Sequence, residues 1–96
     1  VWDPQGRPVL AVGAAGGPTI TVQTARAIMG YVDFGLSPLE SIGLPFLMAM
    51  GDLVLLEKGT WLEGAADRFR GLGHTRLIVR EAPVKAGAVG RTPSGW

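Results

Sequence analysis

Residues 9–21 read VLAVGAAGGPTIT, in which a short apolar run meets three glycines within five residues and continues in a helical pattern. This order predicts a strand that turns sharply into a helix, since glycine permits backbone conformations that other residues avoid. Two explanations fit the glycines. They relieve crowding where the helix packs on the strand, or Gly16 and Gly17 present backbone N–H groups to an anion at the helix N-terminus.

This glycine corner matches neither of two common phosphate-binding motifs. No Lys-Ser/Thr pair follows Gly17, as a P-loop requires. The spacing of Gly13, Gly16 and Gly17 differs from the dinucleotide-binding fingerprint, and no acidic residue lies about twenty positions further on. If the glycines serve a ligand rather than packing, their N–H groups and the helix N-terminus suit a carboxylate or an oxyanion.

Periodicity and capping signals predict the other elements. Ser37 with Glu40, and Thr60 with Glu63, form two capping boxes that predict helix starts. Gly35 is expected to follow the end of the first helix. The sequence predicts a hairpin of residues 1–2 and 9–12, helices over 19–33, from 38 onward and over 61–72, and strands over 52–57, 75–80 and 85–89.

The helix predicted over residues 19–33 is unusually apolar. Its polar residues form one narrow stripe, namely Gln23, Arg26, Gly30 and Asp33. A helix of this kind is normally packed on more than one side. The apolar stretch 42–56 is interrupted by glycine, proline and aspartate and is too short for a transmembrane helix, so we expect no membrane span.

Composition narrows the classes of function. The chain has 96 residues, enough for one domain at most, and nine basic against eight acidic residues give a net charge of +1. This balance does not indicate binding to nucleic acid. The absence of cysteine excludes disulfides and thiolate metal sites, and one histidine excludes a multi-histidine site, so we expect neither metal nor cofactor. The first residues lack the basic and apolar pattern of a secretory leader, so we expect none there, and no compartment is indicated.

The reactive side chains each have a structural explanation. His74 follows Gly73 after a predicted helix end, where it would interact with the last carbonyl groups. Ser37 and Thr60 are explained as N-caps rather than as nucleophiles. Of the remaining charged residues, Asp67, Arg68 and Arg70 belong to a solvated helix face, and Glu57 and Lys58 mark a strand end.

Taken in order, the motifs resemble the γ-glutamyltransferase family. They are GAAGGPTI at 13–20, VDFGLS at 32–37 with Glu40, LEKG at 56–59 and LGH at 72–74. The resemblance implies an α+β fold, as part of an N-terminal-nucleophile hydrolase αββα sandwich, with an antiparallel sheet and helices packed on one face. It also implies that residues 1–96 are a C-terminal segment of the small subunit.

The resemblance further implies an enzyme that cleaves γ-glutamyl amides such as glutathione and transfers the acyl group to water or an amine. Gly16 and Gly17 would form the oxyanion hole through their backbone amides and would thereby bind substrate. The threonine nucleophile and a pair of serines are expected before Val1, so the chain alone should be inactive. Its expected partners are the upstream small-subunit segment and the large subunit.

Several positions depart from the family pattern. Ala14 and Ala15 stand where the family has Ser and Pro, and residues 47–50 (LMAM) replace a polar segment. The family's Asp-Pro-Arg is missing near the C-terminus. Two alternatives follow: a non-catalytic oligomerising domain of the same fold, or part of an acylase for dicarboxylic acyl amides. If the rest of the sandwich is missing, one apolar face of the sheet is exposed to water. We therefore expect the isolated chain to be a homo-oligomer that covers this face.

Overall fold

The computed structural model describes residues 1–82 and 85–96 and divides the chain into two compact units. The first unit contains Val1–Leu44 together with the described residues from Lys85 to the C-terminus. The second unit contains the described residues from Pro45 onward, up to residue 82. Among the described helices, none has the length and hydropathy that a membrane crossing requires.

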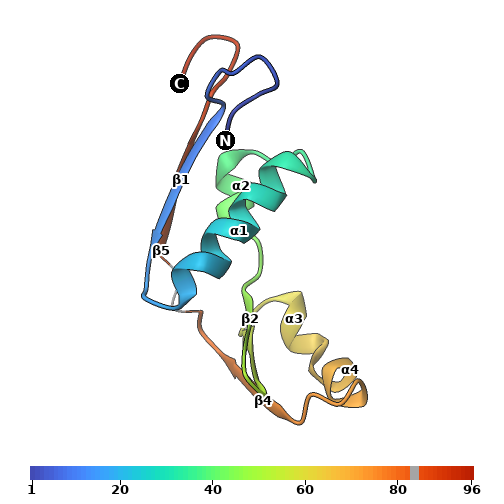
Figure 1. The fold of residues 1–96 in the computed structure, drawn as a ribbon. Helices are drawn as coiled ribbons and strands as arrows, with labels where there is room; N and C mark the ends of the chain where they lie inside the picture. Colours follow the sequence, from blue (N-terminus) through green and yellow to red (C-terminus); the bar gives the residue numbers. More distant parts are fainter. Residues whose placement is uncertain (83–84) are drawn as a thin grey trace. The chain divides into compact units, whose positions relative to one another are not determined.

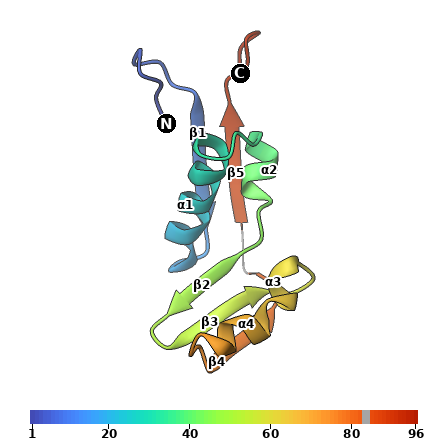
Figure 2. The ribbon, with the colours of Figure 1, turned by 90° about the vertical axis from the view of Figure 1, so that its right-hand side faces the viewer.

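The first unit is a two-stranded sheet covered by two helices. Strand β1 (Leu10–Ala15) pairs antiparallel with β5 (Lys85–Gly90). Helix α1 (Thr19–Val32) packs against β1, and α2 (Pro38–Ile42) packs against α1 and β5 (Figures 1 and 2). The predicted helix over 19–33 and strand over 85–89 are therefore confirmed to within one residue. Gly35 has a positive φ of 66°, as expected beyond a helix end.

Helix α1 is oriented differently from the sequence prediction. Its buried residues are Gln23, Ala27 and Gly30, two of which belong to the predicted polar stripe. Small residues on this face allow close packing, since a Cβ atom on Gly30 would lie 3.0 Å from the Ser41 side chain of α2. Apolar residues of α1 remain exposed instead, namely Ile20, Met29 and Val32. In the described structure the helix is thus packed on its small-residue face.

Helix α2 begins with the predicted capping box. The Ser37 hydroxyl accepts a hydrogen bond from the Glu40 N–H (3.2 Å), and the Glu40 carboxylate accepts one from the Ser37 N–H (2.9 Å). The Ser37 backbone bond lowers the pKa of Glu40 because it favours the charged form. At the other end, Arg26 of α1 donates to the carbonyl groups of Ile42 and Leu44, which lie beyond the helix-internal bonds.

The second unit is a three-stranded sheet in the order β2-β3-β4. Strands β2 (Leu47–Met50) and β3 (Leu53–Glu57) are antiparallel, whereas β3 and β4 (Arg76–Arg80) are parallel. Helices α3 (Trp61–Gly64) and α4 (Ala66–Gly71) connect the parallel strands, and α3 contacts β3 (Figure 2). Val54 and Leu56 of the sheet and Leu62 and Ala66 of the helices form the buried core.

The observed strands correct three details of the sequence analysis. Strand β2 was not among the predicted elements, because residues 47–50 show no alternation of apolar and polar residues. Strand β1 continues to Ala15, so Gly13 lies within the strand opposite Gly87 rather than at the corner. The first residues form only an isolated bridge between Trp2 and Pro8 instead of a paired strand.

The helical region after β3 also differs from its prediction. The single helix expected over 61–72 is divided at Ala65, directly after Gly64, and glycine is a weak helix former. The Thr60 hydroxyl accepts from the N–H of Leu62 (3.3 Å), and the Glu63 carboxylate accepts from Gly59 (2.8 Å). The second capping box is therefore shifted by one residue at both of its bonds. The α+β class is confirmed, but the second sheet contains a parallel pair.

Candidate functional site

The glycine corner joins the end of β1 to the start of α1. After Ala15 the chain passes through Gly16 with φ 128° and Gly17 with φ 58°, and α1 starts at Thr19. Both angles lie in the region that favours glycine. A Cβ atom on Gly17 would meet no atom within 4 Å, so crowding does not explain this glycine. The positive φ angle explains why glycine occupies this position.

Two N–H groups at this corner are available for a ligand. Within residues 1–82 and 85–96, no hydrogen-bond acceptor lies against the N–H of Gly16 or of Gly17. Both glycines are exposed, and they precede a helix of 14 residues whose N-terminus carries positive potential. Two N–H groups beside a helix N-terminus can both donate hydrogen bonds to an anionic oxygen.

The carbonyl groups of the same corner are all occupied. Gly16 C=O accepts from the Thr19 hydroxyl (2.9 Å) and from the Thr19 N–H (3.3 Å), and Gly17 C=O accepts from Ile20 N–H (3.0 Å). Ala15 C=O accepts from the side-chain amide of Gln23 (2.9 Å). The corner therefore directs its acceptors towards α1.

Gln23 is the residue of this site that the sequence analysis missed. Its side chain is 0 % exposed and makes three hydrogen bonds. The Nε2 amide donates to Ala15 C=O and to the Thr19 hydroxyl (2.9 Å each), and Oε1 accepts from Lys85 N–H (2.8 Å). Its neighbours on the same helix face, Ala27 and Gly30, are small, but the local sequence does not show its hydrogen-bond partners, because Lys85 lies 62 positions further along the chain.

The other candidate residues do not gather at the corner. Ser37 caps α2, as predicted, and Glu57 ends β3, where its carboxylate accepts from Phe46 N–H (2.7 Å). The His74 ring meets the Phe69 ring edge-on at 6.0 Å, and the His74 N–H donates to the Phe69 carbonyl (3.0 Å). Asp67 pairs with Arg70 at 2.7 Å on an exposed helix face.

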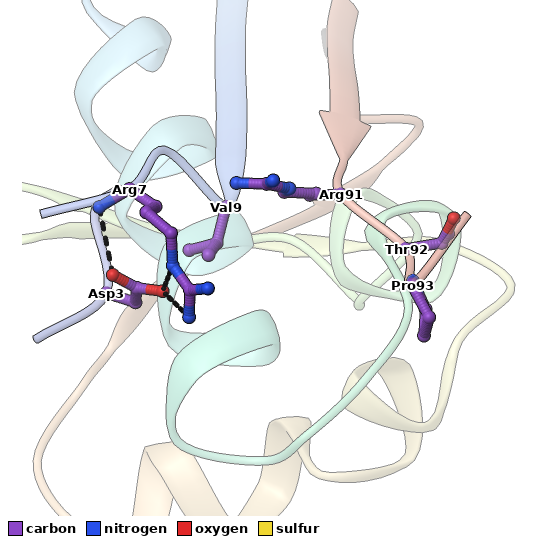
Figure 3. A pocket seen from close by; sticks show the side chains of 6 residues that line it. All are labelled: Asp3, Arg7, Val9, Arg91, Thr92 and Pro93. Carbon is purple, nitrogen blue, oxygen red and sulfur yellow. Dashed lines mark hydrogen bonds and ion pairs between the residues drawn. The ribbon is translucent and has the colours of Figure 1, made fainter. Parts of the chain in front are cut away.

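A separate hollow lies at the opposite end of the two-stranded sheet. It has a volume of about 290 Å³ and is lined by Asp3, Arg7, Val9, Arg91, Thr92 and Pro93 (Figure 3). Arg7 is paired with Asp3 at 2.8 Å, and the backbone N–H of Arg7 lowers the pKa of the Asp3 carboxyl. Six strand residues separate this hollow from the corner, which corresponds to about 20 Å.

The described residues hold no cluster of three or more His, Cys, Asp or Glu side chains that could bind a metal ion. The donors that the corner presents are the backbone N–H groups of Gly16 and Gly17.

The fold is similar to that of several solved structures, although no sequence comparison finds a match. No protein-family model matches the chain, and no curated protein sequence matches it. Among solved structures, an acivicin-inhibited γ-glutamyltranspeptidase matches with a TM-score of 0.85 and 19 % identity, over 97 % of this chain and 50 % of that chain. The T380A mutant of the Helicobacter pylori γ-glutamyltranspeptidase gives 0.83 and 19 %, over 97 % and 50 %.

A third match is the γ-glutamyltranspeptidase from Pseudomonas nitroreducens in complex with L-DON. Its TM-score is 0.78 at 15 % identity, over 99 % of this chain and 51 % of that chain. The chain thus has an α+β fold that is similar to one half of each of these γ-glutamyltranspeptidase chains. It spans about half of their length.

Proposed function

We propose that this chain is the C-terminal segment of the small subunit of a γ-glutamyltransferase-like enzyme and supplies its oxyanion hole. The observation that carries the proposal is the pair of N–H groups at Gly16 and Gly17, just before α1, for which the described residues provide no acceptor. The substrates are γ-glutamyl amides such as glutathione.

The chemistry requires a nucleophile from the upstream segment. A threonine hydroxyl attacks the γ-carbonyl carbon, its α-amine takes the proton, and the carbonyl oxygen becomes an oxyanion. The amides of Gly16 and Gly17 donate to that oxygen. Collapse breaks the amide bond, the amine leaves with a proton, and water or another amine takes the acyl group. One oxyanion donor contributes about 2.7–4 kcal/mol in the transition state.

The coding sequence directly upstream tests the proposal. We expect a threonine at a self-cleavage site, followed later by two adjacent serines just before Val1. An upstream region with neither feature would contradict the enzymatic proposal and favour the non-catalytic alternative.

The isolated 96-residue chain is expected to have no γ-glutamyl transfer or hydrolysis activity, because its first residue is valine and it contains no N-terminal hydroxyl nucleophile. A chromogenic γ-glutamyl anilide provides the assay, with the refolded chain at micromolar concentration. Turnover above background that persists through a second purification would contradict this prediction.

The outer face of the β1–β5 sheet is exposed and is a candidate contact surface for the rest of the enzyme. Outward-facing residues of β1 and β5 include Ala11, Gly13, Gly87 and Val89, and Val89 is 53 % exposed. Such a flat apolar sheet face is normally covered by another layer. We infer that the upstream segment and the large subunit cover this side in the complete enzyme.

Without these partners, the isolated chain is expected to self-associate through the outer face of β1 and β5. Sedimentation equilibrium at low micromolar concentration should give a mass of at least twice 10.1 kDa. As a matched test, the double substitution Ala11→Lys and Val89→Lys, at positions opposite each other in the register, should shift the chain towards monomer. A folded, monodisperse wild-type monomer would show that the face needs no cover.

A non-catalytic oligomerising domain is the second candidate, and the exposed apolar face of α1 favours it. The acylase alternative differs only in the acyl group that the upstream segment recognises. An upstream segment without a carboxylate-binding arginine would favour the acylase. A complete protein that assembles but lacks a nucleophile would favour the oligomerising domain.

A further inference from the structure

Two consecutive glycines make a flexible chain segment, yet an oxyanion hole needs donors that are fixed before the reaction begins. The hydrogen bonds of the corner explain how both requirements are met. They act on the carbonyl groups, which are the opposite ends of the peptide groups that carry the two N–H donors.

The peptide group between Ala15 and Gly16 is held by Gln23. In a trans peptide the C=O and the N–H point in opposite directions, and the described chain contains no cis peptide bond. The bond from Gln23 Nε2 to Ala15 C=O (2.9 Å) directs that carbonyl towards the buried side chain. The N–H of Gly16 therefore points away from it.

The next peptide group is held by Thr19. Its hydroxyl donates to Gly16 C=O (2.9 Å), which fixes the direction of the Gly17 N–H in the same way. The same hydroxyl accepts from Gln23 Nε2 (2.9 Å), so its own proton is directed to Gly16. Gln23 and Thr19 thus form one continuous chain of hydrogen bonds to both peptide groups.

Gln23 is itself firmly anchored. It is 0 % exposed, and its Oε1 accepts from the N–H of Lys85 at the start of β5 (2.8 Å). Both N–H donors and the oxygen of its side-chain amide are thus hydrogen-bonded, to β1, α1 and β5. Losing one hydrogen bond of a buried amide lowers the stability of the fold. The side chain of Gln23 is therefore held in one geometry.

We propose that Gln23 and Thr19 are positioning residues that hold the Gly16 and Gly17 N–H groups in fixed directions. Their effect on catalysis rests on the proposed function, whereas their effect on the glycine backbone does not. These two effects are therefore measured separately.

The first measurement is the ¹⁵N order parameter of the Gly16 and Gly17 amides in the 96-residue chain. The wild-type values should be close to about 0.85, and Gln23→Met or Thr19→Val should lower them to below about 0.6. Thr19→Ser keeps the hydroxyl and should retain the wild-type values. Ser41→Ala, a buried polar substitution in the same unit, is the matched control and should leave both glycines unchanged.

Thr19→Val keeps the test decisive even if Gln23→Met does not fold, because Thr19 is only half-buried. Wild-type order parameters at both glycines in folded Thr19→Val would overturn the proposal.

The second measurement is steady-state kinetics of the complete enzyme. Thr19→Val and Gln23→Met should lower kcat about 10- to 100-fold with KM changed less than about twofold, whereas Thr19→Ser should keep kcat near the wild-type value. If the order parameters fall while kcat is unchanged, the positioning role holds and the oxyanion role of the glycines is wrong. If neither changes, the positioning role is wrong.

Discussion

In the complete enzyme, Gly17→Val is expected to lower kcat by about 10²–10³-fold while substrate binding changes only a few-fold. Gly17 has φ 58°, a conformation that is an outlier for a β-branched residue. Valine would therefore rotate the peptide groups on both sides of position 17. The N–H donors would move away from the developing charge, which exists only in the transition state.

A control variant must separate this loss of kcat from the backbone strain that valine causes at any positive φ. Gly51, in the turn between β2 and β3, has φ 61° and, like Gly17, no atom within 4 Å of a built Cβ. Gly51→Val should therefore cost similar stability but leave kcat near wild type. If Gly17→Val weakens the binding of a ground-state analogue by as large a factor as it lowers kcat, the glycine serves only the backbone conformation.

Leu56→Ala is expected to destabilise the second unit by about 2–5 kcal/mol. Leu56 is 0 % exposed and lies in the core formed with Val54, Leu62 and Ala66. Removing its branched end leaves a cavity in a core with few other residues. Since small domains have a total stability of about 5–15 kcal/mol, this loss would unfold much of the unit.

Urea denaturation of the 96-residue chain, followed by tryptophan fluorescence, measures this loss, because Trp61 lies in the same unit. Leu72→Ala removes the same atoms from a side chain that is 79 % exposed, and should change the free energy of unfolding by less than about 0.5 kcal/mol. Equal midpoints for the two variants would show that the core is not the one described.

The elements that the sequence predicted well are set by local signals. Helix α1 and the Ser37 capping box depend on residues within four positions of each other, and both were confirmed. Strand β2 depends instead on pairing with β3, and residues 47–50 carry no periodic signal of their own. The parallel pairing of β3 with β4 likewise involves residues more than twenty positions apart.

The site shows the same division. The positive φ angles of Gly16 and Gly17 could be inferred from two adjacent glycines before a helix. The burial of Gln23 could not, because one of its partners is Lys85, 62 positions along the chain. The sequence places Gln23 in a polar stripe of α1, whereas its bonds to β1 and β5 place it on the buried face of the helix.

An assay of the complete protein tests most directly the proposal that this chain completes a γ-glutamyl amide-cleaving enzyme. We expect the self-cleaved protein to release the chromophore from a γ-glutamyl anilide and to form a covalent acyl-enzyme at its N-terminal threonine. A glutaryl anilide, which lacks the α-amino group, is the comparison substrate for an acylase. Folded, self-cleaved protein that cleaves only the glutaryl compound, or neither compound, would contradict the account.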